Sequence, residues 1–180
     1  MIRFENVTKV LGSKTVLDDI SFEIGEGETF VIVGLSGAGK SVTLKHMIRL
    51  MAPDQGDVMI DGTAINRLDH TELQQIRSRF GVLFQSAALL QWMSVRDNVA
   101  LPLRELTKMS EEEILQLVDE KLRLLNLSDA ADQFPSDISG GMRKRVGLAR
   151  AIIMKPEIVL YDEPTSGLDP VTSRQIDDLI

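Results

Sequence analysis

Eight consecutive residues constrain this chain more than any other part of it. Residues 34–41 read Gly-Leu-Ser-Gly-Ala-Gly-Lys-Ser and match the pattern G-x-x-x-x-G-K-[ST] at every fixed position. The short apolar segment 29–33 before them predicts a buried strand, and the apolar spacing of residues 41–51 predicts a helix after them. A strand, a glycine-rich turn and a helix in this order predict a P-loop within an α/β fold.

A P-loop binds phosphate for a physical reason. Its glycines let consecutive backbone N–H groups point inward, and the N-terminus of the helix adds a positive end. Lys40 is then expected to neutralise the β- and γ-phosphates of a nucleotide, and the Ser41 hydroxyl to hold Mg²⁺. A glycine-rich turn that binds nothing is disfavoured because every position and both flanks match. The residues expected to contact the nucleotide are Gly34, Ser36, Gly37, Ala38, Gly39, Lys40, Ser41 and Val42.

Two adjacent carboxylates follow another short apolar segment. Residues 158–163 read Ile-Val-Leu-Tyr-Asp-Glu, which predicts a buried strand that ends at Asp162 and Glu163. Because open parallel sheets bind ligands at the carboxyl ends of their strands, Asp162 is a candidate Mg²⁺ ligand. Glu163 is a candidate to polarise the water that attacks the γ-phosphate. Alone, a solvated acidic strand end is the better interpretation, but beside a P-loop the pair indicates a Walker B motif.

A third motif opens a predicted helix. Ser139, Gly140 and Gly141 precede residues with helical spacing up to about residue 155, where Pro156 ends the helix. Such a helix N-terminus has exposed N–H groups and a hydroxyl that can bind a further phosphate. By itself the motif is equally well explained as an ordinary helix cap. Its place between the P-loop and the two carboxylates favours the phosphate-binding interpretation.

Composition excludes several classes of protein. The chain has 20 Lys and Arg against 27 Asp and Glu, a formal net charge of −7, which argues against a nucleic-acid partner. The basic run 143–145 is accordingly expected to be a solvated helix face. With no cysteine, disulfides and thiolate zinc sites are excluded. No apolar segment approaches the roughly 20 residues that span a bilayer, and no secretory signal is recognisable, so a soluble cytoplasmic protein is expected.

The remaining pattern predicts a helical part between two α/β parts. We expect a P-loop α/β core with an N-terminal antiparallel β part over residues 1–86, a helical subdomain over 87–155 and a return to the core over 156–180. A capping box of Ser110 and Glu113 begins one helix of the middle part, and Asp169 before Pro170 begins the last helix. Further expected strands are residues 2–7, 16–24, 58–60 and 81–84, with a helix at 71–79.

The order of the motifs resembles the nucleotide-binding domain of ABC transporters, over residues 2–180. The matching segments are the P-loop, Gln85 as the Q-loop, 138–142 as the signature, 158–163 as Walker B and 166–169 as the D-loop. The resemblance implies a P-loop NTPase with a mostly parallel core sheet, an antiparallel β subdomain and an inserted helical subdomain. It also implies ATP and Mg²⁺ as cofactors, ATP hydrolysis, and a second nucleotide-binding domain as partner in a head-to-tail dimer.

The resemblance carries roles over to individual residues. It implies Glu163, Gln85 and Lys40 as catalytic residues and Ser41, Gln85 and Asp162 as Mg²⁺ ligands. Across the dimer, the nucleotide would meet Ser139, Gly140, Gly141 and Asp169. The family usually places an aromatic residue on the adenine before the first hairpin glycine, but this chain has Leu11 there. We expect weaker stacking, with help from Val16 or Phe4.

A narrower resemblance concerns residues 84–89, 97–104 and 140–145, with Met142 where most ABC proteins have glutamine. These segments are similar to the ATPase subunit of bacterial phospholipid-trafficking transporters, the Mla/Mkl group linked to organic-solvent tolerance. The similarity implies phospholipid cargo, a membrane permease as partner, and a peripheral position on the cytoplasmic face of the inner membrane. Residues 91–95 are expected either to receive the permease or to pack Trp92 and Met93 inside the helical subdomain.

The chain also departs from the family pattern. The family's switch histidine follows Walker B by some thirty residues, beyond residue 180, so we expect a chain truncated at its C-terminus. His46 and His70 are interpreted as polar or half-buried helix residues. Two alternatives to a transport ATPase therefore stay open. One is an ABC-type ATPase without a membrane partner, and the other is an ATP-binding module that does not turn over.

Overall fold

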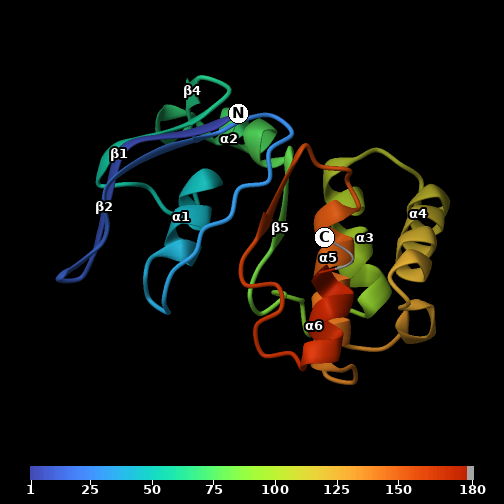
Figure 1. Ribbon diagram of the computed structural model, residues 1–180. Helices are drawn as coiled ribbons and strands as arrows, with labels where there is room; N and C mark the ends of the chain where they lie inside the picture. Colours follow the sequence, from blue (N-terminus) through green and yellow to red (C-terminus); the bar gives the residue numbers. More distant parts are fainter. Residues whose placement is uncertain (178–180) are drawn as a thin grey trace. The chain divides into compact units, whose positions relative to one another are not determined.

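The computed structural model describes residues 1–177, and the chain divides into two compact units between Ser78 and Arg79 (Figure 1). Each unit buries its own apolar residues. Within the described residues, no helix is both long and apolar enough to cross a membrane. The division into parts at residues 86 and 155 stays a prediction.

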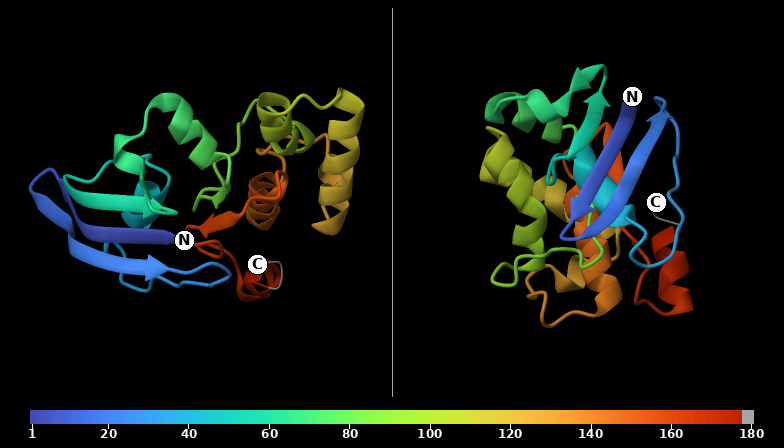
Figure 2. Two further views of the ribbon diagram at one scale, coloured as in Figure 1. Left: turned by 90° about the horizontal axis from the view of Figure 1, so that it is seen from above. Right: turned by 90° about the vertical axis from the view of Figure 1, so that its left-hand side faces the viewer.

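The first unit is built on an antiparallel sheet with the strand order β2-β1-β3-β4. In Figure 2, β1 lies between β2 and β3. Apolar residues alternate along β1, so Ile2, Phe4 and Val7 are buried on one face. Phe4 pairs with Phe22 on one side and Val58 on the other. The strands are β1 (Ile2–Leu11), β2 (Lys14–Ile24), β3 (Gln55–Ile60) and β4 (Thr63–Ala64).

Two helices and a short 3₁₀ turn complete the first unit. Helix α1 (Lys40–Met47) is shorter than the predicted 41–51, and Ile48 ends it. The turn η1 (Ile65–Arg67) leads to α2 (His70–Arg77), which Asp69 and Glu72 begin as a reciprocal capping box. Arg77 donates to the carbonyls of Ile48 and Arg49, each at 2.8 Å, so α2 satisfies the backbone after α1.

The strand predicted at residues 29–33 is not formed. Neither sheet includes this segment, and Val31 and Val33 are 72% and 89% exposed. An apolar segment becomes a strand only where neighbouring strands supply hydrogen-bond partners. The sheet of this unit ends at β2 instead, so apolar composition alone gave the wrong prediction here.

The second unit joins a parallel strand pair to helices. Strands β5 (Phe80–Leu83) and β6 (Ile158–Tyr161) pair in parallel with Leu83 opposite Tyr161. The strand predicted at 158–161 is confirmed, but only Leu160 in it is buried and its neighbours are half-buried. The helices are α3 (Val95–Leu106), α4 (Glu111–Leu124), η2 (Ser128–Ala130), α5 (Gly140–Ile152) and α6 (Pro170–Asp177). Ser110 and Glu113 form the predicted capping box of α4.

Helix α5 lies between β5 and α3 (Figure 1). Two glycines allow this close approach. A Cβ at Gly81 would lie 2.2 Å from the carbonyl oxygen of Ala151, and a Cβ at Gly147 would lie 2.8 Å from the side chain of Leu83. A side chain at Gly81 would require movement of the backbone of α5, and one at Gly147 would displace the side chain of Leu83, so both glycines favour the close spacing between β5 and α5.

Candidate functional site

The P-loop turns between the end of residues 29–33 and α1 through two left-handed glycines. Gly37 has φ 79° and Gly39 has φ 94°, and Ala38 N–H donates to the carbonyl of Leu35 at 3.1 Å. A Cβ at Gly39 would lie 2.9 Å from Leu17 Cδ2 and 3.0 Å from the carbonyl oxygen of Val16. Position 39 therefore requires glycine for two reasons, the left-handed backbone conformation and the close approach of β2.

Lys40 reaches back across the loop. Its Nζ donates to the carbonyl oxygens of Gly34 at 3.0 Å and Leu35 at 3.2 Å. Thr43 anchors the first turn of α1, because both its N–H and its hydroxyl donate to the carbonyl of Gly39, at 2.8 and 3.1 Å. The loop residues Ser36, Gly37 and Ala38 are exposed, and Ser41 and Val42 are half-buried. The loop thus has exposed backbone beside an ammonium group and a helix N-terminus, which suits an anion.

The residues expected to meet a base have different surroundings. Leu11 ends β1 and is 41% exposed, and Val16 lies beside Gly39. Phe4 is only 1% exposed, and its ring stacks on Phe22 with centroids 4.5 Å apart. The expectation that Phe4 helps to hold adenine is therefore wrong, because this ring is part of the core. Leu11 and Val16 remain candidates.

In the second unit, the Q-loop and Walker B side chains meet. Nε2 of Gln85 donates to Oε2 of Glu163 at 3.0 Å and to the hydroxyl of Ser166 at 3.4 Å. Asp162 is 6% exposed, and its N–H donates to the carbonyl of Leu83 at 2.9 Å, which continues the β5–β6 ladder. Glu163 has φ 48°, a left-handed backbone that turns the chain away from the strand end. An amide and two carboxylates thus gather at the carboxyl end of the parallel pair.

A lysine that the sequence analysis missed completes this cluster. Lys144 on α5 is 6% exposed, and its Nζ donates to the carbonyl oxygens of Gln85 and, at 3.2 Å, of Glu163. Burial lowers the pKa of Lys144, while the carboxylates of Asp162 and Glu163 act in the opposite direction. The predicted solvated face at 143–145 is wrong, because this part of α5 packs inward. The apolar residues Val146 and Leu148 on α5 were the available signal, since they place the helix in the core.

The other predicted site residues lie at the N-termini of helices. Ser139 is exposed and caps α5, where its hydroxyl accepts from the N–H of Met142 at 3.2 Å. Gly140 and Gly141 form the first turn of this helix. Asp169 accepts from the N–H of Val171 at 3.0 Å, as the predicted start of α6 requires.

A buried asparagine shapes the segment before α3. Asn98 is fully buried, and its Nδ2 donates to the carbonyls of Leu90, Met93 and Ser94 at 3.0 to 3.1 Å. Trp92, between these carbonyls, is 74% exposed. The alternative in which Trp92 packs inside the helical part is therefore wrong. The segment instead presents an indole ring on a rigid turn, a typical contact residue of protein interfaces.

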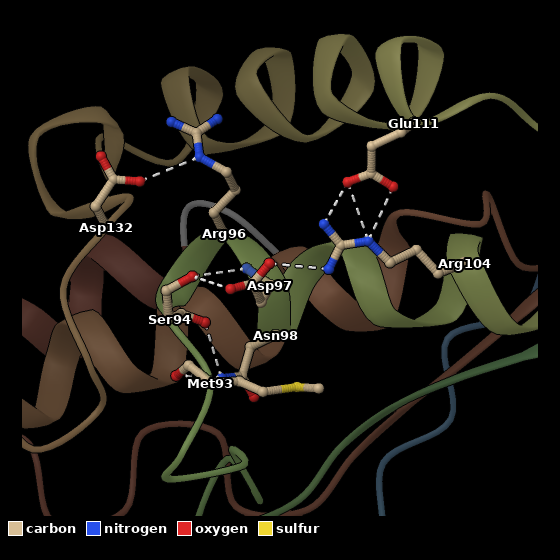
Figure 3. A network of polar contacts seen from close by, with 8 residues as sticks. All are labelled: Met93, Ser94, Arg96, Asp97, Asn98, Arg104, Glu111 and Asp132. Atoms are coloured by element: carbon tan, nitrogen blue, oxygen red, sulfur yellow. Dashed lines mark hydrogen bonds and ion pairs between the residues drawn. The ribbon is translucent and has the colours of Figure 1, made fainter.

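Polar contacts fix α3 against its neighbours (Figure 3). Ser94 caps the helix and bonds the carboxylate of Asp97 at 2.7 Å, and Arg104 bonds the same carboxylate at 2.8 Å. Both hydrogen bonds hold the pKa of Asp97 below its usual value, and the bond from Ser94 has the larger effect. Arg104 also bonds Glu111 at the start of α4. Residues 94–111 are thereby tied into one polar network.

The two histidines differ in exposure. His46 is 1% exposed, with Nδ1 2.7 Å from the carbonyl oxygen of Val42, whereas His70 opens α2 and is exposed. Burial lowers the pKa of His46. His46 is thus a fully buried residue rather than the half-buried one expected.

The predicted site residues are divided between the two units of the chain. The P-loop, Leu11 and Val16 belong to the first unit, while Gln85, Asp162, Glu163, Ser139 and Asp169 belong to the second. Among the described residues, no three His, Asp or Glu side chains converge as a ready metal site.

Comparison with known proteins relates nearly the whole chain to a transporter component. The family described as ABC transporter matches residues 17–166. The probable ribonucleotide transport ATP-binding protein mkl of Mycobacterium leprae is 49% identical over 179 residues, 99% of this chain and 52% of that protein. The intermembrane phospholipid transport system ATP-binding protein MlaF of Haemophilus influenzae is 41% identical over 180 residues, 100% of this chain and 68% of that protein. The chain thus spans about half the length of the mycobacterial relative.

A solved structure supports the fold. The ATP-binding cassette MJ0796, solved as a dimer in a post-hydrolysis state bound to ADP and Pi, matches with a TM-score of 0.91 and 37% identity. The match covers 99% of this chain and 81% of that one. The predicted α/β fold class is confirmed by this likeness.

Proposed function

We propose, since this chain belongs to the ABC transporter family, that it binds and hydrolyses ATP as the motor subunit of a transporter. The observation that carries the proposal is the contact of 3.0 Å between the Gln85 amide and the Glu163 carboxylate in a chain that also has an intact P-loop. Phosphoryl transfer needs a site that positions water and stabilises charge on the γ-phosphate. The chain has residues of the required type for both tasks.

Residues of the first unit bind the nucleotide in this proposal. The backbone N–H groups of Ser36 and Gly37, with those of Gly39 and the start of α1, donate to phosphate oxygens, and the N–H of Ala38 joins them by exchanging its bond to the carbonyl of Leu35. Lys40 exchanges its two loop carbonyls, at 3.0 and 3.2 Å, for the β- and γ-phosphates. Val16 and Leu11 offer aliphatic contacts to the base, which are weaker than aromatic stacking.

Residues of the second unit support the reaction. Glu163 accepts a proton from the attacking water, and Gln85 orients that water and the carboxylate. Asp162, Ser41 and Gln85 are all oxygen donors, which is the ligand type that Mg²⁺ prefers, and the buried carboxylate of Asp162 benefits from a nearby cation. Mg²⁺ bound there would neutralise charge between the β- and γ-phosphates.

The proposed partner is a second copy of the nucleotide-binding domain. Ser139, Gly140, Gly141 and Asp169 would face the nucleotide of that copy. The proposal is supported by the exposed helix start at Ser139 and by the dimeric state of MJ0796. Two helix starts that bind phosphate in one chain suit such a shared site.

Transport requires a membrane partner, and we propose that a permease contacts the segment of Trp92. Support comes from the 74% exposure of this indole on a turn that Asn98 fixes. The protein would then lie peripherally on the cytoplasmic face of the membrane. Phospholipid is the cargo we propose, on the similarity to MlaF. The ribonucleotide transport in the name of mkl is the competing cargo class.

Phosphate release from MgATP over a range of protein concentrations tests the proposal, with ATP binding followed on the same samples. Turnover should rise faster than linearly with protein, because the active form is a dimer. Glu163→Gln should retain ATP, remain dimeric and lose turnover, while the exposed Glu112→Gln behaves as the wild type. A Glu163→Gln chain that stays monomeric with ATP contradicts the motor function, and binding without wild-type turnover favours a binding module.

A further inference from the structure

Helix α5 carries four cationic residues to which the proposed function gives no role, and two of them bind carbonyls of the segment 85–88. Lys144 donates to the carbonyl oxygens of Gln85 and Glu163. Arg150, on the same helix, donates to the carbonyl oxygens of Ala88 at 2.8 Å and Ala87 at 2.7 Å. We call Lys144 and Arg150 the carbonyl clamp, because together they hold three carbonyls of the segment 85–88.

The clamped segment has a backbone that needs support. Ala87 and Ala88 have φ 59° and 47°, two consecutive left-handed residues that both carry a Cβ. This conformation is unfavourable for alanine and persists where contacts fix it. Gly147 leaves room for it, since a Cβ there would lie 3.0 Å from Cβ of Ala87. Helix α5 therefore supplies both the space and the donors that keep the segment in place.

Lys144 acts on both partners of the Gln85–Glu163 contact. It holds the main-chain carbonyl of each, while their side chains meet at 3.0 Å. Glu163 also has a left-handed backbone, with φ 48°, so its carbonyl direction is not fixed by a regular strand. A single ammonium thus fixes two loop residues whose side chains must stay aligned. Its burial at 6% exposure, within reach of the charges of Asp162 and Glu163, keeps it in one position.

We propose that Lys144 is a positioning residue for ATP hydrolysis, which aligns the Gln85 amide with the Glu163 carboxylate by holding the carbonyls of both residues. It acts through these residues and not on the nucleotide. The inference rests on the proposed function, because it assigns Lys144 a part in that reaction. Arg150 supports the same segment from the other end of the clamp.

Kinetics and hydrogen–deuterium exchange on the whole protein test this role. Lys144→Met keeps an unbranched side chain as far as Cε but removes every donor, Lys144→Gln keeps N–H donors without charge, and Lys108→Met is a control at an exposed lysine of the same unit. For Lys144→Met we expect kcat to fall about tenfold or more, while KM for ATP changes less than about threefold. Lys144→Gln should recover part of the loss, and Lys108→Met should match the wild type.

Hydrogen–deuterium exchange of the nucleotide-free protein gives a readout that does not depend on ATPase activity. In Lys144→Met, amides of residues 85–88 and 163–166 should exchange faster, while those of α3 and α4 stay unchanged. Unchanged exchange at 85–88, acceleration throughout the unit, or a kcat within about twofold of the wild type overturns the positioning role. If the wild type itself shows no turnover, the proposed function fails, and exchange alone decides whether Lys144 holds the segment.

Discussion

The side-chain amide of Gln85 donates to the carboxylate of Glu163 at 3.0 Å, although the two residues lie 78 positions apart. Parallel pairing brings them together, because Leu83 and Tyr161 are opposite each other at the ends of β5 and β6. Each residue leaves its strand within two positions of that pair. The contact therefore depends on strand register more than on either loop alone.

We expect Gln85→Ala to lower kcat by about ten- to a hundredfold while ATP binding stays within about threefold of the wild type. The amide is a direct partner of Glu163 but does not belong to the P-loop. Steady-state phosphate release and nucleotide titration measure the two effects. The matched variant Gln75→Ala changes an exposed glutamine on α2 and should alter neither. Equal losses of binding and turnover would point to a collapsed site instead.

Gly39→Ala should destabilise the protein by about 2 kcal/mol or more. The alanine would have to adopt φ 94°, and its Cβ would lie 2.9 Å from the side chain of Leu17 and 3.0 Å from the carbonyl oxygen of Val16. Gly12→Ala is the control, because Gly12 has φ 62° but open space around its Cβ position. Its cost should be about 1 kcal/mol, from backbone strain alone. Urea unfolding of both variants checks the difference, and equal costs would mean that β2 yields to the side chain.

Stability should fall as the pH decreases below the ordinary His46 pKa of 6.5. Burial depresses this pKa in the folded state, so the unfolded chain binds the proton more readily. The contribution of neutral His46 to the free energy of unfolding is present above about pH 6.5. It is lost on acidification, by at most about 1.4 kcal/mol per pH unit. Urea unfolding at about pH 7.5 and about pH 5.5 measures it. His46→Gln should reduce the change in unfolding free energy between the two pH values, and His70→Gln should not. If both variants keep the wild-type pH dependence, the dependence comes from other groups.

Trp92→Ala should change the free energy of unfolding by less than about 0.5 kcal/mol, because the indole is 74% exposed. Val99→Ala, at a fully buried position of α3, should cost about 2 kcal/mol. Chemical denaturation gives both values. Since the chain has a single tryptophan, fluorescence of the wild type also reports the exposure directly. Strong protection of Trp92 from a soluble quencher would contradict the exposed position.

Local sequence patterns predicted much of the fold and the motifs. The capping box at Ser110, the strand at 158–161 and the helix starts at Ser139 and Asp169 all depend on short-range rules and are confirmed. The turn glycines of the P-loop were also recognisable. These features are encoded within a few residues of one another, so a single sequence suffices to find them.

Features that depend on distant neighbours were not predictable in the same way. The segment 29–33 has strand composition but belongs to neither sheet. Phe4 was one of two residues expected to help hold the base, yet cross-strand pairing with Phe22 buries it. The net charge of −7 favoured a solvated helix face at residues 143–145, whereas Lys144 donates to carbonyls 59 and 19 positions away. Tertiary packing decided each of these cases.

The glycines at 81 and 147 have a mechanical consequence. Gly81 brings β5 against the backbone of α5, and at Gly147 only the side chain of Leu83 lies between the two elements, so they pack with little material between them. We therefore expect α5 and β5 to move together, so that a displacement of the helix that begins after Ser139 would also displace the strand that ends before Gln85.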